Sequence, residues 1–417
     1  MRKISLYISI VILFFITGCG GENDFSNKKV EVVGGKEISN FSSKDVTLWA
    51  RENGYINSDI ELYGYKAYKI PYTTTDESGN RVNASGVMVV PNIDAASESL
   101  ASKYSKLKSS GFSLVLDCHG TIFANNEAPS ELIANSKNPK GTGVLFSSYG
   151  GFITLLPDYI GFGDSKEQYH PYLLKKSSAN SVKDFLQASI EFAQNNDIKL
   201  KPKKDTYLTG YSEGGYVALA SLGLLEDEFY KIKIAAPMDG PYLLGGLGDA
   251  IMDMDSIDTP AFVANIIYSY SKAYKKSLSS IIQEPYASKL EEWLSGKYTS
   301  EQIDEFLPYK LKGEDGLIKD AFIESYSTSW LRARLYKNSA IDLGIGEYRS
   351  KIKLIHCRGD DVIPYKMATE TKKYLIGSDV ELITVEDRVE AKSLNHIECA
   401  TPAYMIALKL FIEDRDK

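Results

Sequence analysis

The segment with the clearest chemical content is G-Y-S-E-G at residues 210–214. Residues 206–209 before it are β-branched, aromatic or aliphatic, which favours a short buried strand, and residues 215–225 after it are rich in Ala and Leu, which favours a helix. A serine on a sharp turn between a strand and a helix exposes its hydroxyl, and flanking glycines avoid collisions in such a tight turn. The pattern therefore predicts that Ser212 is a nucleophile.

A serine hydroxyl needs a base to take its proton and a third group to orient that base. In enzymes built on this turn, the three residues follow one another in the order serine, acid, histidine. The chain has four histidines, and His119 and His170 precede the serine, while His356 lies inside a predicted strand at 351–357. The only histidine left is His396, in a loop after the last predicted strand, so we predict that it is the base.

The acid is expected in the turn G-D-D-V-I-P at residues 359–364, directly after the strand at 351–357. Two carboxylates stand there, Asp360 and Asp361. The alternative for this turn is a pair of solvated aspartates that cap a helix starting near Tyr365. Position and chain order favour an orienting role for one of the two.

A tetrahedral intermediate needs backbone N–H groups directed at its oxyanion. The amide of Glu213 is the first candidate, because the residue after the nucleophile begins a helix and the first N–H groups of a helix have no partner within it. The second candidate is Thr121, or its neighbour Gly120, in the segment C-H-G-T that follows a predicted strand at 112–117.

The first 19 of the 417 residues have the features of a targeting segment. Arg2 and Lys3 precede an apolar run at 4–16, which is too short for a stable membrane-spanning helix, and I-T-G-C follows at 16–19. This looks like a bacterial lipobox, which predicts a signal peptide at 1–18 and a lipidated Cys19. The alternative is an ordinary secretory signal with a chance cysteine. A polar tether and N-terminal segment are expected at 19–58.

The charge balance of the remaining chain argues against a nucleic-acid partner. Without Arg2 and Lys3, the chain has 46 basic and 55 acidic residues, so its net charge is about −9. After Cys19, only Cys118, Cys357 and Cys399 remain, and this small, odd number excludes a disulfide scaffold. Cys357 and Cys399 flank the predicted acid and base and could lie near each other, but we favour two buried free thiols.

The rest of the chain reads as alternating strands and helices around an insertion. Two strand-like runs at 64–72 and 82–91 predict an antiparallel hairpin on the sheet edge, and later strands alternate with helices in a doubly wound α/β pattern. The segment 237–342 is mainly helical by pattern, and a final helix is expected at 402–412. The predicted domains are a core at 59–240, a helical cap at 241–342 and the second part of the core at 343–417.

Taken together, six segments resemble the secretory lipase family of α/β-hydrolases. They are A-S-G-V-M-V-V-P at 84–91, C-H-G-T at 118–121, P-D-Y-I-G-F-G-D-S at 157–165, H-P-Y at 170–172, G-Y-S-E-G-G at 210–215 and D-D-V-I-P at 360–364. The resemblance implies an α/β-hydrolase fold with a helical cap over a mostly parallel sheet. It also implies a triad of Ser212, Asp360 and His396 that hydrolyses carboxylic esters. Asp360 is preferred over Asp361 because it stands four residues before the proline, as in the family.

Two residues depart from the family pattern. Glu213 stands where glutamine is common, and Cys357 stands where a glycine is usual.

We predict that the protein is an esterase or lipase without cofactor or metal, and that it is a monomer. We further predict that it is exported and lipid-anchored to the cell envelope, at the periplasmic or surface face of the outer membrane. Its substrate would be a small-molecule or lipid ester. The alternatives are a serine peptidase of the prolyl-oligopeptidase type on the same scaffold, and a catalytically silent surface binding protein.

Overall fold

The structure, a computed structural model, describes residues 34–57, 59–94, 96–201, 205–227, 230–341, 348–375 and 378–417. The predicted signal peptide at 1–18 and the predicted lipidation at Cys19 lie outside the described residues. Within the described ranges, no helix has both the length and the apolar character that a membrane crossing requires.

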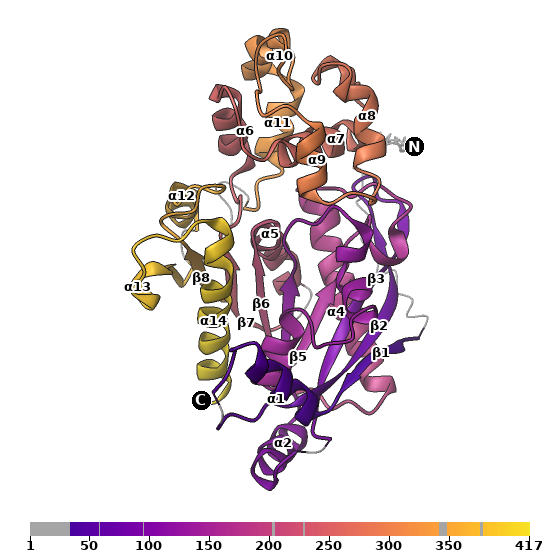
Figure 1. Cartoon of the computed structure of the whole chain (residues 1–417), viewed down its shortest axis with the longest axis vertical. Helices are drawn as coiled ribbons and strands as arrows, with labels where there is room; N and C mark the ends of the chain where they lie inside the picture. The colour runs from indigo at the N-terminus through magenta and orange to yellow at the C-terminus, as the bar shows by residue number, and fades with distance from the viewer. Residues whose placement is uncertain are drawn as a thin grey trace, which may run out of the picture.

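In the part of the chain that the structure describes, nine strands form one sheet at the centre of the molecule (Figure 1). Its spatial order is β1-β2-β3-β5-β4-β6-β7-β8-β9, with antiparallel pairing from β1 to β5 and parallel pairing from β5 to β9. The strands are β1 Lys36–Phe41, β2 Gly64–Thr75, β3 Arg81–Asn92, β4 Leu114–Cys118, β5 Ile153–Pro157, β6 Thr206–Tyr211, β7 Ile232–Met238, β8 Lys351–His356 and β9 Val380–Thr384. The predicted α/β class with a mostly parallel sheet is confirmed.

The central strands are buried on both faces, which explains their continuous apolar runs. All residues of β4, β5 and β6 are buried. Successive side chains alternate between the faces, so Leu114 and Leu116 pack into the larger core cluster, whereas Val115 between them belongs to the cluster on the other face.

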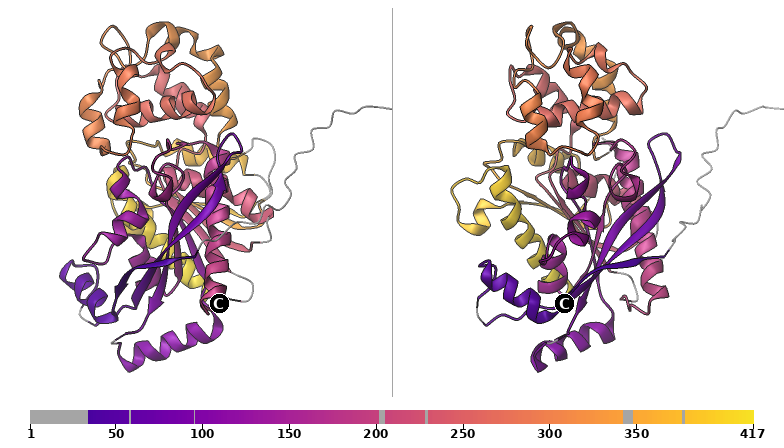
Figure 2. Two further views of the ribbon diagram at one scale, coloured as in Figure 1. Left: turned by 90° about the vertical axis from the view of Figure 1, so that its right-hand side faces the viewer. Right: turned by 45° about the vertical axis from the view of Figure 1, so that its right-hand side comes forward.

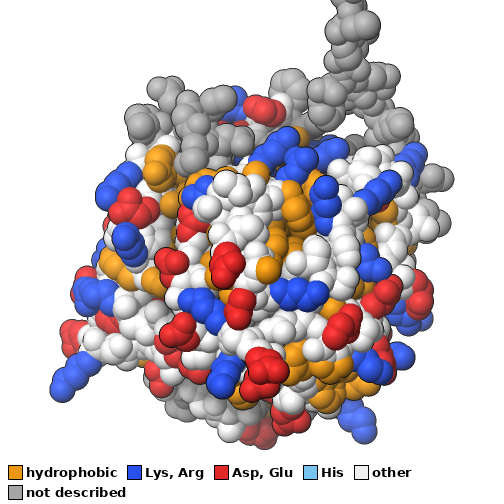
Figure 3. Space-filling view, turned by 90° about the horizontal axis from the view of Figure 1, so that it is seen from above, with side chains coloured by type: hydrophobic (Ala, Val, Ile, Leu, Met, Phe, Trp, Pro, Cys, Tyr) orange, Lys and Arg blue, Asp and Glu red, His pale blue; other side chains and the backbone are white. Residues whose placement is uncertain are grey.

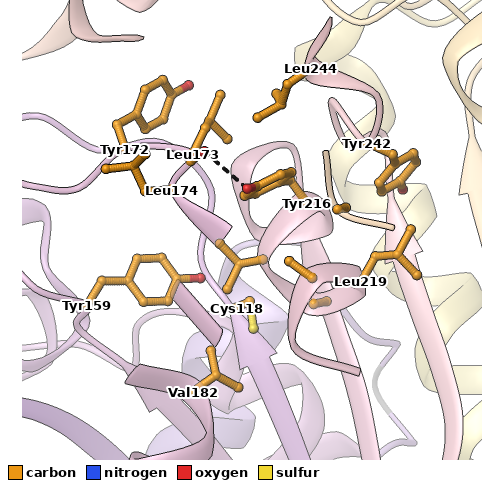
Figure 4. Packing of buried hydrophobic residues seen from close by; sticks show 14 of the residues in the cluster. Cys118, Tyr159, Tyr172, Leu173, Leu174, Val182, Tyr216, Leu219, Tyr242 and Leu244 are labelled. Carbon is orange, nitrogen blue, oxygen red and sulfur yellow. Dashed lines mark hydrogen bonds between the residues drawn. The ribbon is translucent and has the colours of Figure 1, made fainter. Parts of the chain in front are cut away.

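Helices cover both faces of the sheet. The helices α4 and α5 contact each other and pack on one face, and α14 lies on the other face against β6, β7 and β8 (Figures 1 and 2). Figure 4 shows the first face, where Val182 of α4 and Leu219 of α5 lie near Cys118 at the end of β4. The helices outside the insertion are α1 Ser43–Glu52, α2 Glu98–Ser110, α3 Pro129–Ala134, α4 Lys175–Asn195, α5 Glu213–Asp227, α12 Lys366–Tyr374, α13 Glu386–Val389 and α14 His396–Arg415.

The predicted hairpin is present as β2 and β3, but its expected place at the sheet edge is wrong. The short strand β1 pairs antiparallel with β2 and forms the edge instead. Its sequence, K-E-I-S-N-F, has little regular alternation, and its register shifts between Glu37 and Ser39. A short, irregular edge strand of this kind leaves a weak periodic signal.

The last helix begins six residues earlier than expected, at His396 rather than at Pro402. Asn395 caps it: its side chain accepts the N–H of Glu398, and the Glu398 carboxylate accepts the N–H of Asn395. Pro402 therefore lies inside the helix, and not at its first turn, where proline is most common. The shift matters because it places His396 at a helix N-terminus.

Among the described residues between β7 and β8, six helices gather at one end of the sheet (Figures 1 and 2). They are α6 Leu244–Asp253, α7 Pro260–Ala273, α8 Tyr286–Trp293, α9 Ser300–Phe306, α10 Asp320–Ser325 and α11 Trp330–Lys337. Thr299 and Gln302 form a capping box at the start of α9. Seen from above, this end mixes charged with hydrophobic side chains (Figure 3), and Tyr309 is the most exposed of its large hydrophobic residues.

The helical block is joined to the sheet by buried polar contacts. The Tyr270 hydroxyl of α7 donates a hydrogen bond to the carbonyl oxygen of Leu173 (3.0 Å). The Tyr216 hydroxyl of α5 lies 3.1 Å from the same oxygen and 2.8 Å from the carbonyl oxygen of Asn338. Figure 4 shows the bond from Tyr216 to Leu173. The Ser269 hydroxyl of α7 lies 3.2 Å from the carbonyl oxygen of His170. These contacts hold α7 beside the segment that carries His170.

Candidate active site

Ser212 lies on the turn between β6 and α5, with φ of 58°. This left-handed conformation costs an L-residue roughly 1–2 kcal/mol, and the surrounding backbone holds it: the Ser212 N–H donates to the carbonyl oxygen of Met238 at 3.0 Å. A Cβ atom at Gly210 or Gly214 would collide with the carbonyl oxygen of Cys118. The turn therefore requires both glycines, as the sequence predicted.

Three predicted residues meet at this turn. His396 Nε2 lies 2.9 Å from Ser212 Oγ, and His396 Nδ1 lies 2.6 Å from Asp360 Oδ2. Since a carboxylate can only accept, Nδ1–H donates to Asp360, and Nε2 is left to accept the serine O–H. The Asp360 side chain is fully buried and that of His396 is 12% exposed. The arrangement can transfer the serine proton to an oriented imidazole.

Asp360 is held as a carboxylate by the donors around it. Its Oδ1 accepts the backbone N–H groups of Val362 (2.9 Å) and Ile363 (2.7 Å). Burial raises the pKa of Asp360, but the hydrogen bond and charge of His396, together with the other donors, outweigh burial and leave this pKa below its usual value. The neighbouring Asp361 contacts the backbone and not the ring, because its Oδ1 accepts the His396 N–H at 3.0 Å.

A disulfide ties the acid-bearing segment to the base-bearing helix. Cys357 follows β8, three residues before Asp360, and its sulfur is bonded to Cys399, three residues after His396 in the first turn of α14. The expectation of two free thiols is therefore wrong. The sequence did hint at this bond, because Cys357 and Cys399 flank the predicted acid and base, which must lie close together. The spacing of the two cysteines along the chain does not reveal that their segments lie side by side. Cys118 is a buried free cysteine.

The loop after β4 reaches the nucleophile, as predicted. A Cβ atom on Gly120 would lie 3.8 Å from Ser212 Cβ, so this loop runs beside the serine. The Thr121 hydroxyl is 2.9 Å from that of Tyr172, and the Thr121 backbone N–H makes no hydrogen bond within the described residues. Glu213 is the first residue of α5. The oxyanion role of these two amides stays a prediction.

The side chain of Glu213 has a partner that the sequence did not indicate. Its Oε1 lies 2.8 Å from His170 Nε2, and His170 Nδ1 lies 2.8 Å from the carbonyl oxygen of Ile160. Since a carbonyl can only accept, Nδ1 carries a proton, and the contact between His170 and Glu213 therefore needs a second proton. This buried pair anchors the first turn of α5 to the segment that contacts α7. The position of His170 before Ser212 in the chain excludes it as the base, but does not indicate this supporting contact with Glu213.

A small cavity opens beside this pair, between the loop after β4 and the helical block. Phe123 and Phe162 contribute apolar surface, and His170, Asn265 and Tyr268 contribute polar groups. A second, more apolar cavity lies among α6, α7 and α11.

Asp117, next to the end of β4, is a buried carboxyl outside the predicted site. It is bonded by the hydroxyl groups of Thr142 and of Tyr404 on α14. Burial raises the pKa of Asp117 to about 7, although both hydroxyl donors lower it. Since the folded state holds the proton more tightly than the unfolded state, this group contributes stability at low pH that is lost as pH rises towards 7.

We therefore expect Asp117→Asn to reduce the loss of stability at high pH. In the wild type, Asp117 has a pKa near 7 in the folded state and about 4 in the unfolded chain, so its ionisation lowers the free energy of unfolding by roughly 3 kcal/mol between pH 5 and pH 8. Asparagine does not ionise, so the variant lacks this loss. Urea denaturation of both proteins at the two pH values measures the difference. The exposed Asp315→Asn should keep the wild-type dependence. Equal pH dependence in wild type and Asp117→Asn would contradict the assignment.

Comparison with known proteins supports the fold. The profile of the prolyl oligopeptidase family matches residues 143–238, a minor part of the chain that includes the turn at Ser212. No curated protein matches the sequence. Among solved structures, a presumed hydrolase from Legionella pneumophila is similar over 92% of this chain and 97% of its own, with 22% identity and a TM-score of 0.77.

Two further structures have described activities. The rice cell wall degrading esterase LipA from Xanthomonas oryzae is similar over 93% of this chain and 97% of its own, with 19% identity and a TM-score of 0.74. Lipase A of Candida antarctica, in its closed state, is similar over 89% of this chain and 78% of its own, with 12% identity and a TM-score of 0.63. At these identities the likeness shows the fold alone, and it is the α/β-hydrolase fold.

Proposed function

We propose that this protein is a serine hydrolase that cleaves carboxylic esters, with Ser212 as nucleophile, His396 as base and Asp360 as the residue that orients the base. The observation that carries the proposal is the continuous pair of hydrogen bonds, 2.9 Å from Ser212 to His396 and 2.6 Å from His396 to Asp360. Three residues remote in sequence meet in the geometry that activates a serine hydroxyl.

In the proposed reaction, Ser212 Oγ attacks the ester carbonyl carbon while its proton passes to His396 Nε2. The carbonyl oxygen becomes an oxyanion, which the backbone N–H groups of Glu213 and Thr121 stabilise. The tetrahedral intermediate collapses, and His396 gives the proton to the departing alcohol, which leaves an acyl group on Ser212. A water molecule then gives its proton to His396 and attacks the acyl carbon, and the collapse of the second intermediate releases the acid and restores the Ser212 hydroxyl.

The comparisons support an ester substrate over a peptide. The esterase from Xanthomonas oryzae is similar over nearly the whole chain, including the helical block. The prolyl oligopeptidase profile matches only residues 143–238, a segment around the nucleophile turn that ends before the helical block. That match is the observation in favour of the second candidate, a serine peptidase.

A comparison of substrates tests the proposal. We expect the purified protein to hydrolyse p-nitrophenyl esters, with a kcat/KM at least about 100-fold above that for a prolyl anilide, because an ester alcohol is a better leaving group than an amine. A series of acyl lengths then defines the acyl site. Preference for the anilide would establish the peptidase, and lack of turnover of both would favour the silent binding protein.

We further propose that the protein acts outside the cytosol, anchored through a lipid at Cys19. The support is the N-terminal sequence together with the disulfide between Cys357 and Cys399, because disulfides persist in oxidising compartments. Membrane fractionation of cells that make the full chain is the measurement that checks this location.

A further inference from the structure

A second buried carboxyl lies directly behind the proposed triad. Asp239 is the first residue after β7, and its side chain is fully buried. Its φ of 43° turns the chain at the end of the strand. Carboxylate oxygens of Asp239 and Asp360 and a ring nitrogen of His396 all lie within 4.8 Å of one another. The segments that follow two neighbouring strands, β7 and β8, thus each place an aspartate beside the same histidine.

The groups around Asp239 do not neutralise a negative charge. Its Oδ1 accepts the Cys357 N–H at 3.0 Å. Its Oδ2 lies 3.3 Å from Cys399 Sγ, which has no proton to donate because it is part of the disulfide. His356 Nε2 lies 3.6 Å from Oδ1 but is 2.8 Å from the carbonyl oxygen of Ile363, to which it donates. Burial lowers the pKa of His356, which favours its neutral form.

No lysine or arginine forms an ion pair with Asp239 within the described part of the chain. The titratable groups that face it are Asp360, Glu386, His356, His396, Tyr211 and Tyr242. Burial raises the pKa of Asp239 well above its usual value, and the adjacent Asp360 raises it further. Since Asp360 is held as a carboxylate by His396, a proton shared by the two carboxyls resides on Asp239.

We propose that Asp239 is a positioning residue, a neutral carboxylic acid whose O–H donates a hydrogen bond to the Asp360 carboxylate. The hydrogen-bonded chain then runs from Ser212 through His396 and Asp360 to Asp239. The O–H donor stabilises the ionised form of Asp360 and holds its Oδ2 towards His396 Nδ1. When His396 takes the serine proton, Asp360 stays ionised and stabilises the imidazolium. This inference rests on the proposed function of the triad.

Two substitutions test the role by kinetics. Asp239→Gly suits the positive φ and removes the donor, so we expect kcat for an ester to fall about 10- to 100-fold with KM within about twofold. Asp239→Asn restores a donor to Asp360 and an acceptor for the Cys357 N–H, so it should recover most of that loss. In Asp239→Asn, the pH at the midpoint of the acidic limb of the kcat/KM profile should also stay unchanged, because a neutral amide replaces a neutral carboxylic acid.

Three kinetic results would overturn the proposal: wild-type kcat in Asp239→Gly, no recovery in Asp239→Asn, or a clear shift of the acidic limb in Asp239→Asn. The last result would mean that Asp239 carries a charge. If Asp239→Gly does not fold, the asparagine variant alone decides through its pH profile.

An infrared measurement locates the proton without any turnover. In Ser212→Ala protein at pH 7, we expect a protonated-carboxyl C=O band, besides the one that Asp117 contributes with its pKa near 7, that disappears when Asp239→Asn is added and persists with Asp361→Asn, which alters an exposed carboxylate. No difference band between Ser212→Ala and its Asp239→Asn derivative would overturn the proposal. Because this readout needs no substrate, it separates a failure of this inference from a failure of the proposed ester hydrolysis.

Discussion

Replacing Ser212 with alanine should lower kcat for an ester roughly 10⁴- to 10⁶-fold while the protein stays folded. The reason is that alanine has no hydroxyl to receive the acyl group, although His396 and Asp360 keep their mutual hydrogen bond. The same change should remove labelling by a fluorophosphonate probe, which reacts with activated serines. Alanine fits the site by size, and the strain at φ of 58° is present in the wild type too.

A serine on the adjoining helix provides the matched control. Ser221 of α5 is buried and donates a hydrogen bond to the carbonyl oxygen of Val217 at 2.7 Å. Ser221→Ala also removes a buried hydroxyl, and we expect it to retain both labelling and turnover. Persistent labelling of Ser212→Ala, or its loss in Ser221→Ala, would show that another serine is the nucleophile.

The parts of the structure that depend on short-range patterns could be predicted from the sequence. The turn at Ser212 needs a buried strand, two glycines and an Ala-rich helix, all within 20 residues, and the fold class follows from repeated units of this kind. Chain order then excluded three of the four histidines and left His396. The structure places it 2.9 Å from Ser212.

The parts that depend on which strands become neighbours could not be predicted. β7 and β8 pair in parallel although 112 residues separate Met238 from Lys351, and only this pairing brings Asp239 beside Asp360 and Cys357. No local periodicity encodes such a register. For the same reason the disulfide between Cys357 and Cys399 was missed, since it depends on α14 returning across β8.

The early start of α14 shows how a local signal can be misread. Pro402 favoured a helix start, because proline has no N–H and is common in a first turn. Asn395 and Glu398 are a stronger start signal, and both side chains accept backbone N–H groups in a capping box. His396 therefore sits at the first turn of a helix, its backbone N–H held by Asp361. Its ring is hydrogen-bonded to both Asp360 and Ser212.

Asp360→Asn should lower kcat for an ester about 10⁴-fold, with a much smaller change in KM. In the wild type, Nδ1–H of His396 donates to Asp360 Oδ2 over 2.6 Å, so Nε2 is free to accept the Ser212 proton. An asparagine that directs its NH₂ group at Nδ1 favours the other tautomer, in which Nε2 carries the hydrogen and cannot act as base. Steady-state kinetics at saturating ester measure the effect, and circular dichroism checks the fold.

The neighbouring aspartate offers a control with the same chemical change one residue away. Asp361 accepts the backbone N–H of His396 at 3.0 Å, and an asparagine there keeps a carbonyl oxygen that can accept the same bond. Since Asp361→Asn leaves the contact between the ring and Asp360 intact, we expect its kcat to fall less than about tenfold. If Asp361→Asn were the more damaging of the two, or if Asp360→Asn kept a tenth of the wild-type rate, Asp360 would not be the residue that orients the base. The large loss of kcat is expected only when the carboxylate that contacts His396 Nδ1 is replaced. If only the negative charge of the turn after β8 mattered, Asp360→Asn and Asp361→Asn would lower kcat equally.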